Sequence, residues 1–554
     1  MTIRNLLEDA AGTNPDSLAM MYRRDKEWQK RSYAEMLRGV REMGEAYGTR
    51  FSLQPQRENV ALILPNGPEW LECYLAQSGA GVAVVPLDPK LRDDEVAYIL
   101  ENSGAVVVTT DSHHIPMMEA IAPKLPALRA VVVVGGGAPE KVGELPVYDY
   151  ESLRKPLEGG KAPWYDANKA KDDDVASVIY TSGTTGKPKG AMLTHGNFTS
   201  DAEGAFGAFG MPITKEDTFL VILPLFHAYA FCTNFVVPMM KGSPMFFNES
   251  LRTIGEDMKT LSPSIVMAVP LLAEKMYDKI KKNIQSSIMA RILMAVGLGF
   301  IVTRKILQGL GGKLRFMIVG GAPCPKEVLE GYKRLGINLL EGYGLTECSP
   351  VVSVAGPDCA RIGTIGHKLT NIEIRLADQN ENGVGELQVK GPVVMRGYWK
   401  NEEATADAFD DGWLRTGDLA DIGPDGLITI RGRKKALIVN REGKNIYPEE
   451  VENCIGADPI LQDLVVIGYK VGKDPGEHVG VIIHPNEDLI KERTGKAMSW
   501  EDMERMVNLG VRQRCAKLAD YKRPRKIVIW KEPLERTSIQ KVRRVAYQGK
   551  LDEK

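Results

Sequence analysis

The chain of 554 residues lacks the features that mark several large classes of protein. Its formal net charge is −1, so no global basic surface favours binding to nucleic acid. The seven cysteines are scattered without a CxxC pair, which argues against a disulfide framework and against a structural zinc site. Residues 1–16 are polar and acidic and lack the apolar core of a signal peptide, so we expect a cytoplasmic protein.

Long apolar runs are also missing. The longest uninterrupted one, Ile292–Val302, is far shorter than the roughly 20 residues that a membrane-spanning helix needs. A core helix with a solvated basic rim is one interpretation of this run, and a helix that lies on a membrane surface is the other. The sequence therefore predicts no transmembrane segment and leaves peripheral membrane contact open. The basic residues around the run are Lys279, Lys281, Lys282, Arg291, Arg304 and Lys305.

The chain does contain a long alternation of apolar strands and helices. A chain of this length needs at least two domains. Continuous apolar strands alternate with helices over residues 59–134 and again over 218–344, which indicates parallel sheets with helices on both faces. After Gly363 come short strands separated by glycine and asparagine turns, as in a small antiparallel unit.

These patterns predict an α/β fold of two domains. The large N-terminal domain, residues 1–432, would hold two doubly wound α/β subdomains plus the small β unit. Residues 433–554 would form a small α+β C-terminal domain. The basic run RGRKKALI, which starts at Arg431, is the candidate hinge between the two domains.

The segment SGTTGKPKG, residues 182–190, is the first candidate for chemistry. Its glycines allow a tight backbone whose N–H groups face a polyanion, and phosphate suits such a loop because it offers several acceptor oxygens. A P-loop is excluded by the spacing of the glycines and by Pro188 after the lysine. A flexible polar turn without a ligand remains the alternative. The candidate phosphate-binding residues are Thr181, Ser182, Gly183, Thr184, Thr185, Gly186, Lys187 and Lys189.

With its flanking residues, the segment YTSGTTGKPKG resembles the signature of the AMP-forming acyl-CoA synthetases. This adenylating family also holds luciferases and the adenylation domains of peptide synthetases. The resemblance covers essentially the whole chain, because four further motifs follow in the family's order and spacing: EGYGLTE (Glu341–Glu347), WLRTGDLA (Trp413–Ala420), RGRKK (Arg431–Lys435) and KVRR (Lys541–Arg544). It implies a ligase that uses ATP, Mg²⁺ and coenzyme A to convert a carboxylic acid to acyl-AMP and pyrophosphate, and then to acyl-CoA and AMP.

The resemblance also assigns the residues around the phosphates. Glu347 is implied as a ligand of Mg²⁺, with the Thr184 hydroxyl beside it, because hard oxygen ligands suit this ion. Thr346 would contact the α-phosphate. Lys541 would bridge the attacking carboxylate and the α-phosphate as charge builds between them. Gln540 departs here from the family's usual glycine, and a solvated lysine in a basic tail is the alternative for Lys541.

The remaining nucleotide contacts are implied by the motifs that follow. Tyr343 would stack on adenine, Asp418 would accept both ribose hydroxyls, and Arg433 would donate to the same ribose. Taken alone, Tyr343 is equally an ordinary core aromatic, and Asp418 a turn residue. The backbone around the base would come from small residues and the EGYG stretch: Gly321, Ala322, Pro323, Glu341, Gly342 and Gly344.

The family pattern further implies a moving C-terminal domain. Lys435 falls at the family's hinge position, and rotation there would deliver Lys541 in the first step. A second face near Gly443 would then line a tunnel for the thiol, although Gly443 is also a plain turn glycine. His227, within LPLFHAYAF, would lie near the acyl pocket, or it is a satisfied core histidine.

The sequence defines the acyl group less well than it defines the reaction. LPLFHAYAF and the helical insert at 277–311 resemble medium- or long-chain fatty acyl-CoA synthetases, while a cyclic or aromatic acid stays open. The direction of the reaction and the oligomeric state stay open too. One alternative is an acyl-AMP ligase that loads a carrier protein, although the insertion usual in that group is not evident. The other is a non-catalytic binding homologue, against which the retention of Lys541, Glu347 and Asp418 argues.

Overall fold

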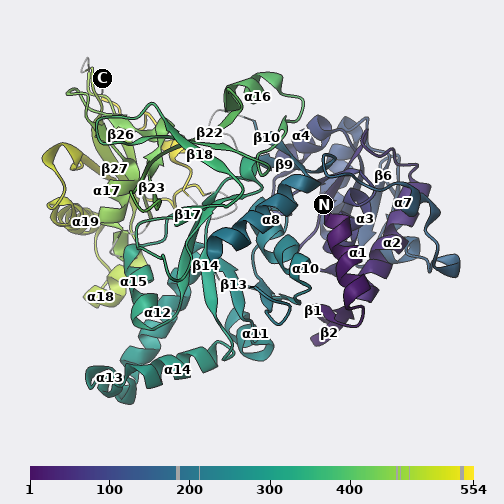
Figure 1. Ribbon diagram of the computed structural model, residues 1–554. Coiled ribbons are helices and arrows are strands. Elements are labelled where there is room, and N and C mark those ends of the chain that lie inside the picture. The colour runs from purple at the N-terminus through teal and green to yellow at the C-terminus, as the bar shows by residue number, and fades with distance from the viewer. Residues whose placement is uncertain are drawn as a thin grey trace.

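The computed structural model describes residues 1–181, 187–210, 213–456, 459–461, 463–472, 475–536 and 542–553. Figure 1 shows three parts side by side: an N-terminal α/β part, a central sheet with its helices, and a C-terminal domain. None of the helices in these ranges is both long and apolar enough to cross a bilayer.

The first large sheet is built mainly from residues of the first 200. Its central strands are parallel, because apolar runs such as NVALI and AVVVTTD are buried on both faces. Helices α2 (Tyr33–Arg50) and α3 (Pro68–Ser78) pack on one face, and α4 (Asp93–Ser103) and α5 (Ile115–Ile121) pack on the other. The strands, in spatial order, are β20 (Gly397–Tyr398), β10 (Lys189–Thr194), β9 (Val175–Thr181), β4 (Ala83–Pro86), β3 (Asn59–Ile63), β5 (Ala105–Asp111), β6 (Ala130–Val134), β8 (Leu145–Asp149) and β7 (Lys141–Val142).

The second large sheet runs through the centre of the molecule. Its parallel strands are covered by α11, α12 and α15 on one face, while the other face shares one core with the first sheet. The strands, in spatial order, are β17 (His367–Lys368), β16 (Val351–Val354), β15 (Leu339–Gly344), β14 (Phe316–Val319), β13 (Ile265–Ala268), β11 (Phe219–Val221), β12 (Met245–Phe247), β1 (Leu18–Arg24) and β2 (Glu27–Ser32).

The helices of these two parts begin where the sequence offers caps. Ser32 with Glu35 forms a capping box at the start of α2, and Thr194 with Asn197 does so at α8. The helices are α1 (Ile3–Thr13), α2 (Tyr33–Arg50), α3 (Pro68–Ser78), α4 (Asp93–Ser103), α5 (Ile115–Ile121), α6 (Tyr150–Leu153), α7 (Pro163–Ala167), α8 (His195–Phe209), α9 (Ala228–Phe231), α10 (Val237–Lys241), α11 (Ile254–Leu261), α12 (Pro270–Ser286), α13 (Ile288–Ala295), α14 (Gly299–Gly309), α15 (Lys326–Arg334) and α16 (Glu402–Ala408).

The small β unit and the C-terminal domain follow. Antiparallel pairing joins the strands of the β unit: β18 (Glu373–Ala377), β19 (Gly385–Lys390), β21 (Phe409–Asp410), β22 (Trp413–Ile422) and β23 (Ile428–Arg433). The C-terminal domain has its own core. Its elements are β24 (Ile438–Val439), β25 (Asn445–Ile446), α17 (Pro448–Ile455), β26 (Asp463–Tyr469), β27 (His478–His484), α18 (Glu487–Thr494), α19 (Trp500–Cys515) and β28 (Lys526–Ile529).

The predicted α/β class and its architecture are therefore confirmed: two α/β subdomains, a small β unit and a smaller α+β domain. Strands β3, β4 and β9 of the first sheet and β13, β14 and β15 of the second direct their carboxyl ends toward one cleft. This edge of a parallel sheet is where open α/β folds bind ligands.

Candidate active site

The cleft has a volume of about 4230 Å³ and lies between the two large sheets, the β unit and the C-terminal domain. The chain reaches it from the loops that follow parallel strands and from the hairpin of β22 and β23. Thr181, Lys189, Tyr343, Glu347 and Asp418 all line it. These candidate site residues lie up to about 240 positions apart in the sequence. The fold brings them together at one cleft.

The predicted phosphate loop begins and ends at the cleft. Thr181 is the last residue of β9, and Lys189 pairs with it as the first residue of β10. The Lys187 ammonium lies 5.0 Å from the centre of the Tyr98 ring, and the Lys189 ammonium 5.3 Å from that of Tyr398, in the range of a cation–π contact. The predicted residues Ser182, Gly183, Thr184, Thr185 and Gly186 lie outside the described residues.

Glu347, the predicted metal ligand, lies in a 3₁₀ turn of residues Thr346–Cys348 at the cleft. The Tyr398 hydroxyl donates to Glu347 Oε1 at 2.7 Å. Burial, and then the Glu347 carboxylate, raise the pKa of Tyr398, so this hydroxyl keeps its proton. Tyr398 thus contacts both the Lys189 ammonium and the Glu347 carboxylate.

A hard cation fits this arrangement only with help from a bound nucleotide. Glu347 supplies carboxylate oxygens of the kind that Mg²⁺ prefers. Within the described ranges, no group of three His, Cys, Asp or Glu side chains is placed to hold a metal ion. Phosphate and water oxygens would therefore have to supply most of the other ligands.

Asp418 is held by a tyrosine and an arginine in the hairpin of β22 and β23. It is 4% exposed and lies opposite Arg433 in the strand register. The Tyr343 hydroxyl donates to Asp418 Oδ2 at 2.6 Å, and Arg433 Nε lies 2.8 Å from Oδ1. Burial, and then the charge of Asp418, raise the pKa of Tyr343. A carboxylate is an acceptor with several lone pairs, a chemistry that suits donors such as the hydroxyls of a ribose.

The loop after β14 and strand β15 forms a narrow slot beside Tyr343. A Cβ atom at Gly320 would lie 3.2 Å from Tyr229 Cζ and 3.4 Å from the Gly342 carbonyl oxygen. Gly321 has a φ of +84° in the left-handed region, where glycine is favoured. The predicted residues Ala322 and Pro323 line the cleft next to it. These small residues let a flat group approach the backbone.

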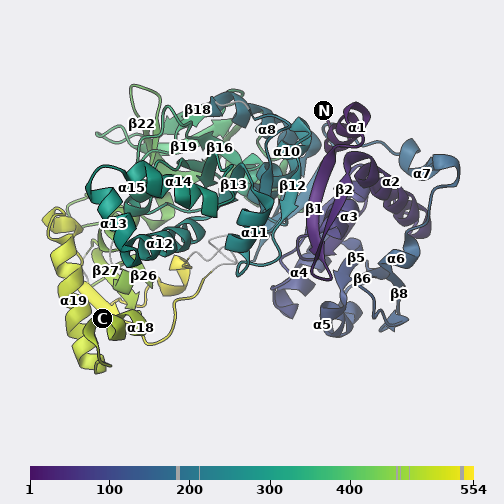
Figure 2. The same ribbon diagram turned by 90° about the horizontal axis from the view of Figure 1, so that it is seen from below.

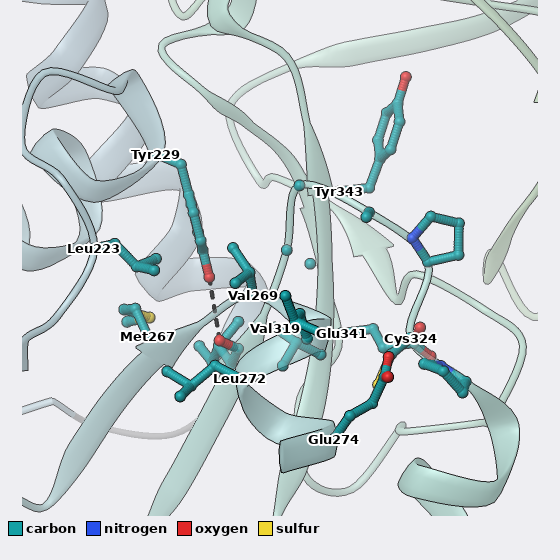
Figure 3. A pocket seen from close by; sticks show the side chains of 18 of the residues that line it. Leu223, Tyr229, Met267, Val269, Leu272, Glu274, Val319, Cys324, Glu341 and Tyr343 are labelled. Atoms are coloured by element: carbon teal, nitrogen blue, oxygen red, sulfur yellow. Dashed lines mark hydrogen bonds between the residues drawn. The ribbon is translucent and has the colours of Figure 1, made fainter. Parts of the chain in front are cut away.

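An acidic group lies at the other end of this slot. Figure 3 shows Glu341 and Glu274 close to Cys324, on the side of the pocket away from the Tyr343 ring. Burial raises the pKa of Glu341 to about 7, and backbone hydrogen bonds at Cys324 and Gly363 oppose the shift. Glu341 was predicted from its motif, whereas Glu274 on α12 was not.

An apolar pocket opens next to the slot. Figure 3 shows Leu223, Met267, Val269, Leu272 and Val319 gathered around Tyr229, away from the Tyr343 ring. The Tyr229 hydroxyl donates to the Ile318 carbonyl oxygen at 3.2 Å, which fixes the ring as a wall of the pocket. The pocket is therefore suited to an apolar group rather than to a charged one.

His227, the predicted pocket histidine, lies at the start of α9 and lines the cleft. Its ring centre is 4.4 Å from that of Phe226, and its Nε2 is buried without a hydrogen-bond partner among the described residues. Burial lowers its pKa to about 4, against the charge of Asp88, so it is neutral at pH 7. A buried nitrogen of this kind is open to a polar atom of a ligand.

With this geometry in place, comparison with known proteins decides the family. A family model described as AMP-binding enzyme matches residues 7–399. The chain belongs to the AMP-binding enzyme family. The resemblance and the enzyme class that the motifs predicted, an acyl-CoA synthetase, are confirmed.

Several relatives of this AMP-binding enzyme are curated proteins. Long-chain-fatty-acid–CoA ligase FadD15 of Mycobacterium bovis is 32% identical over 438 residues, which cover 74% of this chain and 71% of the relative. Long-chain-fatty-acid–CoA ligase 6 of Mus musculus is 32% identical over 472 residues, which cover 79% of this chain and 68% of the relative.

Solved structures match over almost the whole length. ATP-bound MatB from Rhodopseudomonas palustris is 25% identical, with a TM-score of 0.75 and 99% of each chain covered. The o-succinylbenzoate coenzyme A synthetase MenE from Bacillus subtilis, in complex with ATP and magnesium ion, is 24% identical, with a TM-score of 0.75 and 98% of each chain covered. These likenesses confirm the fold.

In the C-terminal domain of this AMP-binding enzyme, the segment that follows Lys541 faces the cleft. Lys541 itself lies outside the described residues, but the next residue, Val542, lines the cleft. Arg544 anchors this segment to the domain, because its Nη1 lies 2.8 Å from Glu449 Oε1 and its Nη2 2.7 Å from Glu452 Oε1.

The predicted hinge residue, Lys435, and the predicted thiol-tunnel residue, Gly443, differ in their position relative to the cleft. Lys435 is exposed in the 3₁₀ turn that directly follows β23, and it lines the cleft. Gly443 has a φ of +72° in the turn between β24 and β25, and it does not line the cleft in the part of the chain that the structure describes. Its role in binding the thiol stays a prediction.

Proposed function

We propose that the chain is an ATP-dependent ligase that joins a medium- or long-chain fatty acid to coenzyme A through an acyl-adenylate. The observation that carries this proposal is a single cleft with two unlike ends. A buried carboxylate, Asp418, is held by Tyr343 and Arg433 at one end, and an apolar pocket around Tyr229 opens at the other. Such a site suits a sugar hydroxyl and an acyl chain at once.

The nucleotide would be positioned by groups on both sides of the slot. Asp418 would accept hydrogen bonds from the ribose hydroxyls, and Arg433 would donate to the same sugar. The adenine would enter the slot formed by Gly320–Pro323 against the Tyr343 ring. The motif backbone at Gly342 and Gly344 and the Thr346 hydroxyl would lie along the base and the α-phosphate.

The triphosphate would lie along the loop that begins at Thr181. Lys187 and Lys189 would neutralise its terminal phosphates, and the hydroxyls and glycines of residues 182–186 would add donors. When bound at Glu347, Mg²⁺ would supply further positive charge to the phosphate oxygens. The Thr184 hydroxyl would join Glu347 there, as the family pattern implies.

In the first step a carboxylate oxygen of the acid forms a bond to the α-phosphorus, and the bond between that phosphorus and the β-phosphate oxygen breaks. Pyrophosphate carries the displaced electron pair away, and no proton is transferred. Because two anions must meet, the step depends on alignment and on neutralisation of charge. The Lys541 ammonium would lie between the carboxylate and the α-phosphate.

The acyl chain would occupy the apolar pocket. Leu223, Met267 and Val319 offer only hydrocarbon and thioether surface, and the neutral imidazole of His227 adds no charge at pH 7. Both curated ligases described above are named for long-chain fatty acids. These observations favour a fatty acid over a small polar acid.

The second step would use the C-terminal domain, residues 433–554, in another orientation. The coenzyme A thiol, as its thiolate, attacks the acyl carbon, and AMP leaves. Rotation at Lys435 would replace the Lys541 face with the face near Gly443, beside the large domain of residues 1–432. We also propose that the protein is cytoplasmic and makes peripheral contact with a membrane.

The proposal is tested by exchange of labelled pyrophosphate into ATP with a panel of acids, followed by addition of coenzyme A. Exchange should depend on the acid and should be stronger for fatty acids of eight or more carbons than for acetate, on the order of tenfold or more. Acyl-CoA should form when coenzyme A is added. The proposal would be contradicted if no acid supported exchange, or if the acyl group were transferred only to a carrier protein.

A further inference from the structure

An exposed apolar surface covers the hairpin of α13 and α14. Among the described residues, fourteen large apolar side chains are strongly exposed, and eight of them lie between residues 288 and 301. Ile288 and Phe300 expose 66% and 67% of their surface. Figure 1 shows the hairpin at the lower edge of the molecule, and both Figure 1 and Figure 2 show it away from the N-terminal part. A cluster of this kind marks a contact surface.

The charge around the hairpin has one sign. No aspartate or glutamate occurs between Asp278 and Glu327, whereas residues 279–315 carry eight lysines and arginines. Lys282, Arg291 and Arg304 are exposed. The hairpin thus combines an apolar tip with a basic rim, which is complementary to an anionic surface that has an apolar interior.

The hairpin is also continuous with the active-site cleft. Leu293 of α13 and Val302 of α14 line the same cleft as Met267 and Leu272 of the apolar pocket. Ile280 of α12, which is buried and lies between Leu272 and Leu293 in the sequence, lines it as well. The cleft therefore extends from the candidate acyl pocket to the exposed hairpin, and apolar side chains line it in both regions.

We propose that the α13–α14 hairpin inserts its apolar tip into the surface of an anionic phospholipid bilayer. Its exposed apolar side chains lie on α13, in the turn around Val296 and on α14, so a surrounding apolar medium covers them better than one flat partner. A second copy of the chain would bring two basic rims together, which is repulsive. Fatty acid dissolved in the bilayer would enter the cleft at this hairpin, and this second part rests on the proposed function.

The test is flotation of the full-length protein with vesicles of phosphatidylcholine, with and without phosphatidylglycerol. The protein should float with the anionic vesicles, and added salt should weaken binding. The double substitution Ile288→Ser/Phe300→Ser should lower the partition coefficient about tenfold. Leu509→Ser removes another strongly exposed apolar side chain, from α19, and should change the partition coefficient less than about twofold.

Three outcomes would overturn the inference. They are no flotation with any vesicle, equal flotation of the double variant and the wild type, and a wild-type dimer in sedimentation that the double variant loses. Ile288 and Phe300 are exposed, so their replacement leaves no core cavity, and matching thermal melts confirm that the variant folds.

A second readout separates this inference from the proposed function. The double variant should retain full pyrophosphate exchange with octanoate in vesicle-free buffer, and it should lose exchange with palmitate supplied in anionic vesicles. Flotation without exchange for any acid would contradict the ligase function and leave the docking surface standing. Exchange without flotation would contradict the docking surface and leave the ligase function standing. Equal use of vesicle-borne palmitate by both proteins would refute entry of the acid at the hairpin.

Discussion

Asp418 shows how single residues acquire a role from their neighbours. A glycine-rich turn does not by itself indicate a function for its aspartate. Only the surrounding motif implied a role for Asp418 in binding the ribose. The structure surrounds its two oxygens with the Tyr343 hydroxyl and the Arg433 guanidinium, and leaves it 4% exposed. A buried carboxylate held in this way is oriented before any ligand arrives, which favours tight binding of a diol.

Removing the Tyr343 hydroxyl tests this orientation. Tyr343→Phe keeps the ring but deletes the donor at 2.6 Å from Asp418 Oδ2. A hydrogen bond to a charged group contributes about 1.5–3 kcal/mol, so we expect the KM for ATP to rise roughly tenfold to a hundredfold. Steady-state kinetics measures this. Tyr33→Phe, which deletes a buried hydroxyl that bonds the Ser243 carbonyl oxygen away from the cleft, is the control and should leave the KM for ATP unchanged. An unaltered KM in Tyr343→Phe would refute the ribose role.

Glu341 should make stability depend on pH. Burial raises its pKa to about 7 from an ordinary 4.5, so the folded state holds this proton more tightly than the unfolded state. The stability that the proton contributes is complete below pH 4.5 and is lost as pH rises through 7. Glu341→Gln should therefore gain stability relative to the wild type between pH 4.5 and 8, on the order of 2–3 kcal/mol.

Urea unfolding at pH 5 and at pH 8 measures this difference. Glu119→Gln, at an exposed position on α5, is the matched control for the loss of one carboxylate. If Glu341→Gln and the wild type differ by the same amount at pH 5 and pH 8, the raised pKa of Glu341 is refuted.

At the scale of elements, strand β15 is constrained by close backbone contact. A Cβ atom at Gly344 would lie 1.8 Å from the Pro350 carbonyl oxygen, and pairing of Gly344 with Val351 prevents the two chains from separating. Gly344→Ala should therefore cost on the order of 2–4 kcal/mol of unfolding free energy. It should also disturb the neighbouring Tyr343.

Thermal and urea unfolding of this variant is compared with Gly12→Ala. A Cβ atom at Gly12 in α1 meets no atom within 4 Å, so alanine there should be neutral or slightly stabilising. Equal stability of the two variants would show that β15 and β16 can move apart at Gly344.

Much of this element arrangement could be predicted from sequence, and some of it could not. Apolar runs such as residues 59–63 identified the parallel strands, because burial on both faces leaves a continuous pattern. Pairing of β1 with β12 could not be predicted, since it joins residues more than 220 positions apart. Tyr98, Tyr398 and Glu274 were missed for the same reason: each reaches the site only through the fold.

At the scale of the whole molecule, the proposed two-step reaction depends on the orientation of the C-terminal domain. Val542 lines the cleft, and the role in adenylation that we propose for Lys541 needs the segment around Val542 to lie there. Lys435→Pro would fix φ at the turn after β23 and so hinder rotation of the domain. Pyrophosphate exchange should remain within about twofold, while acyl-CoA formation falls on the order of tenfold or more.

Lys435→Ala is the control for this experiment, because it removes the same side chain without fixing φ. It should retain both half-reactions. Loss of exchange to the same degree as loss of acyl-CoA formation in Lys435→Pro would contradict a hinge at this position.

We propose that the cleft joins a carboxylate to the α-phosphorus of ATP. The most direct measurement supplies a fatty acid labelled with ¹⁸O in both carboxyl oxygens, together with ATP and coenzyme A, and weighs the products by mass spectrometry. Attack on the α-phosphorus predicts AMP that carries one ¹⁸O atom, with unlabelled pyrophosphate. Label in inorganic phosphate, or AMP without ¹⁸O, would contradict attack of the carboxylate on the α-phosphorus.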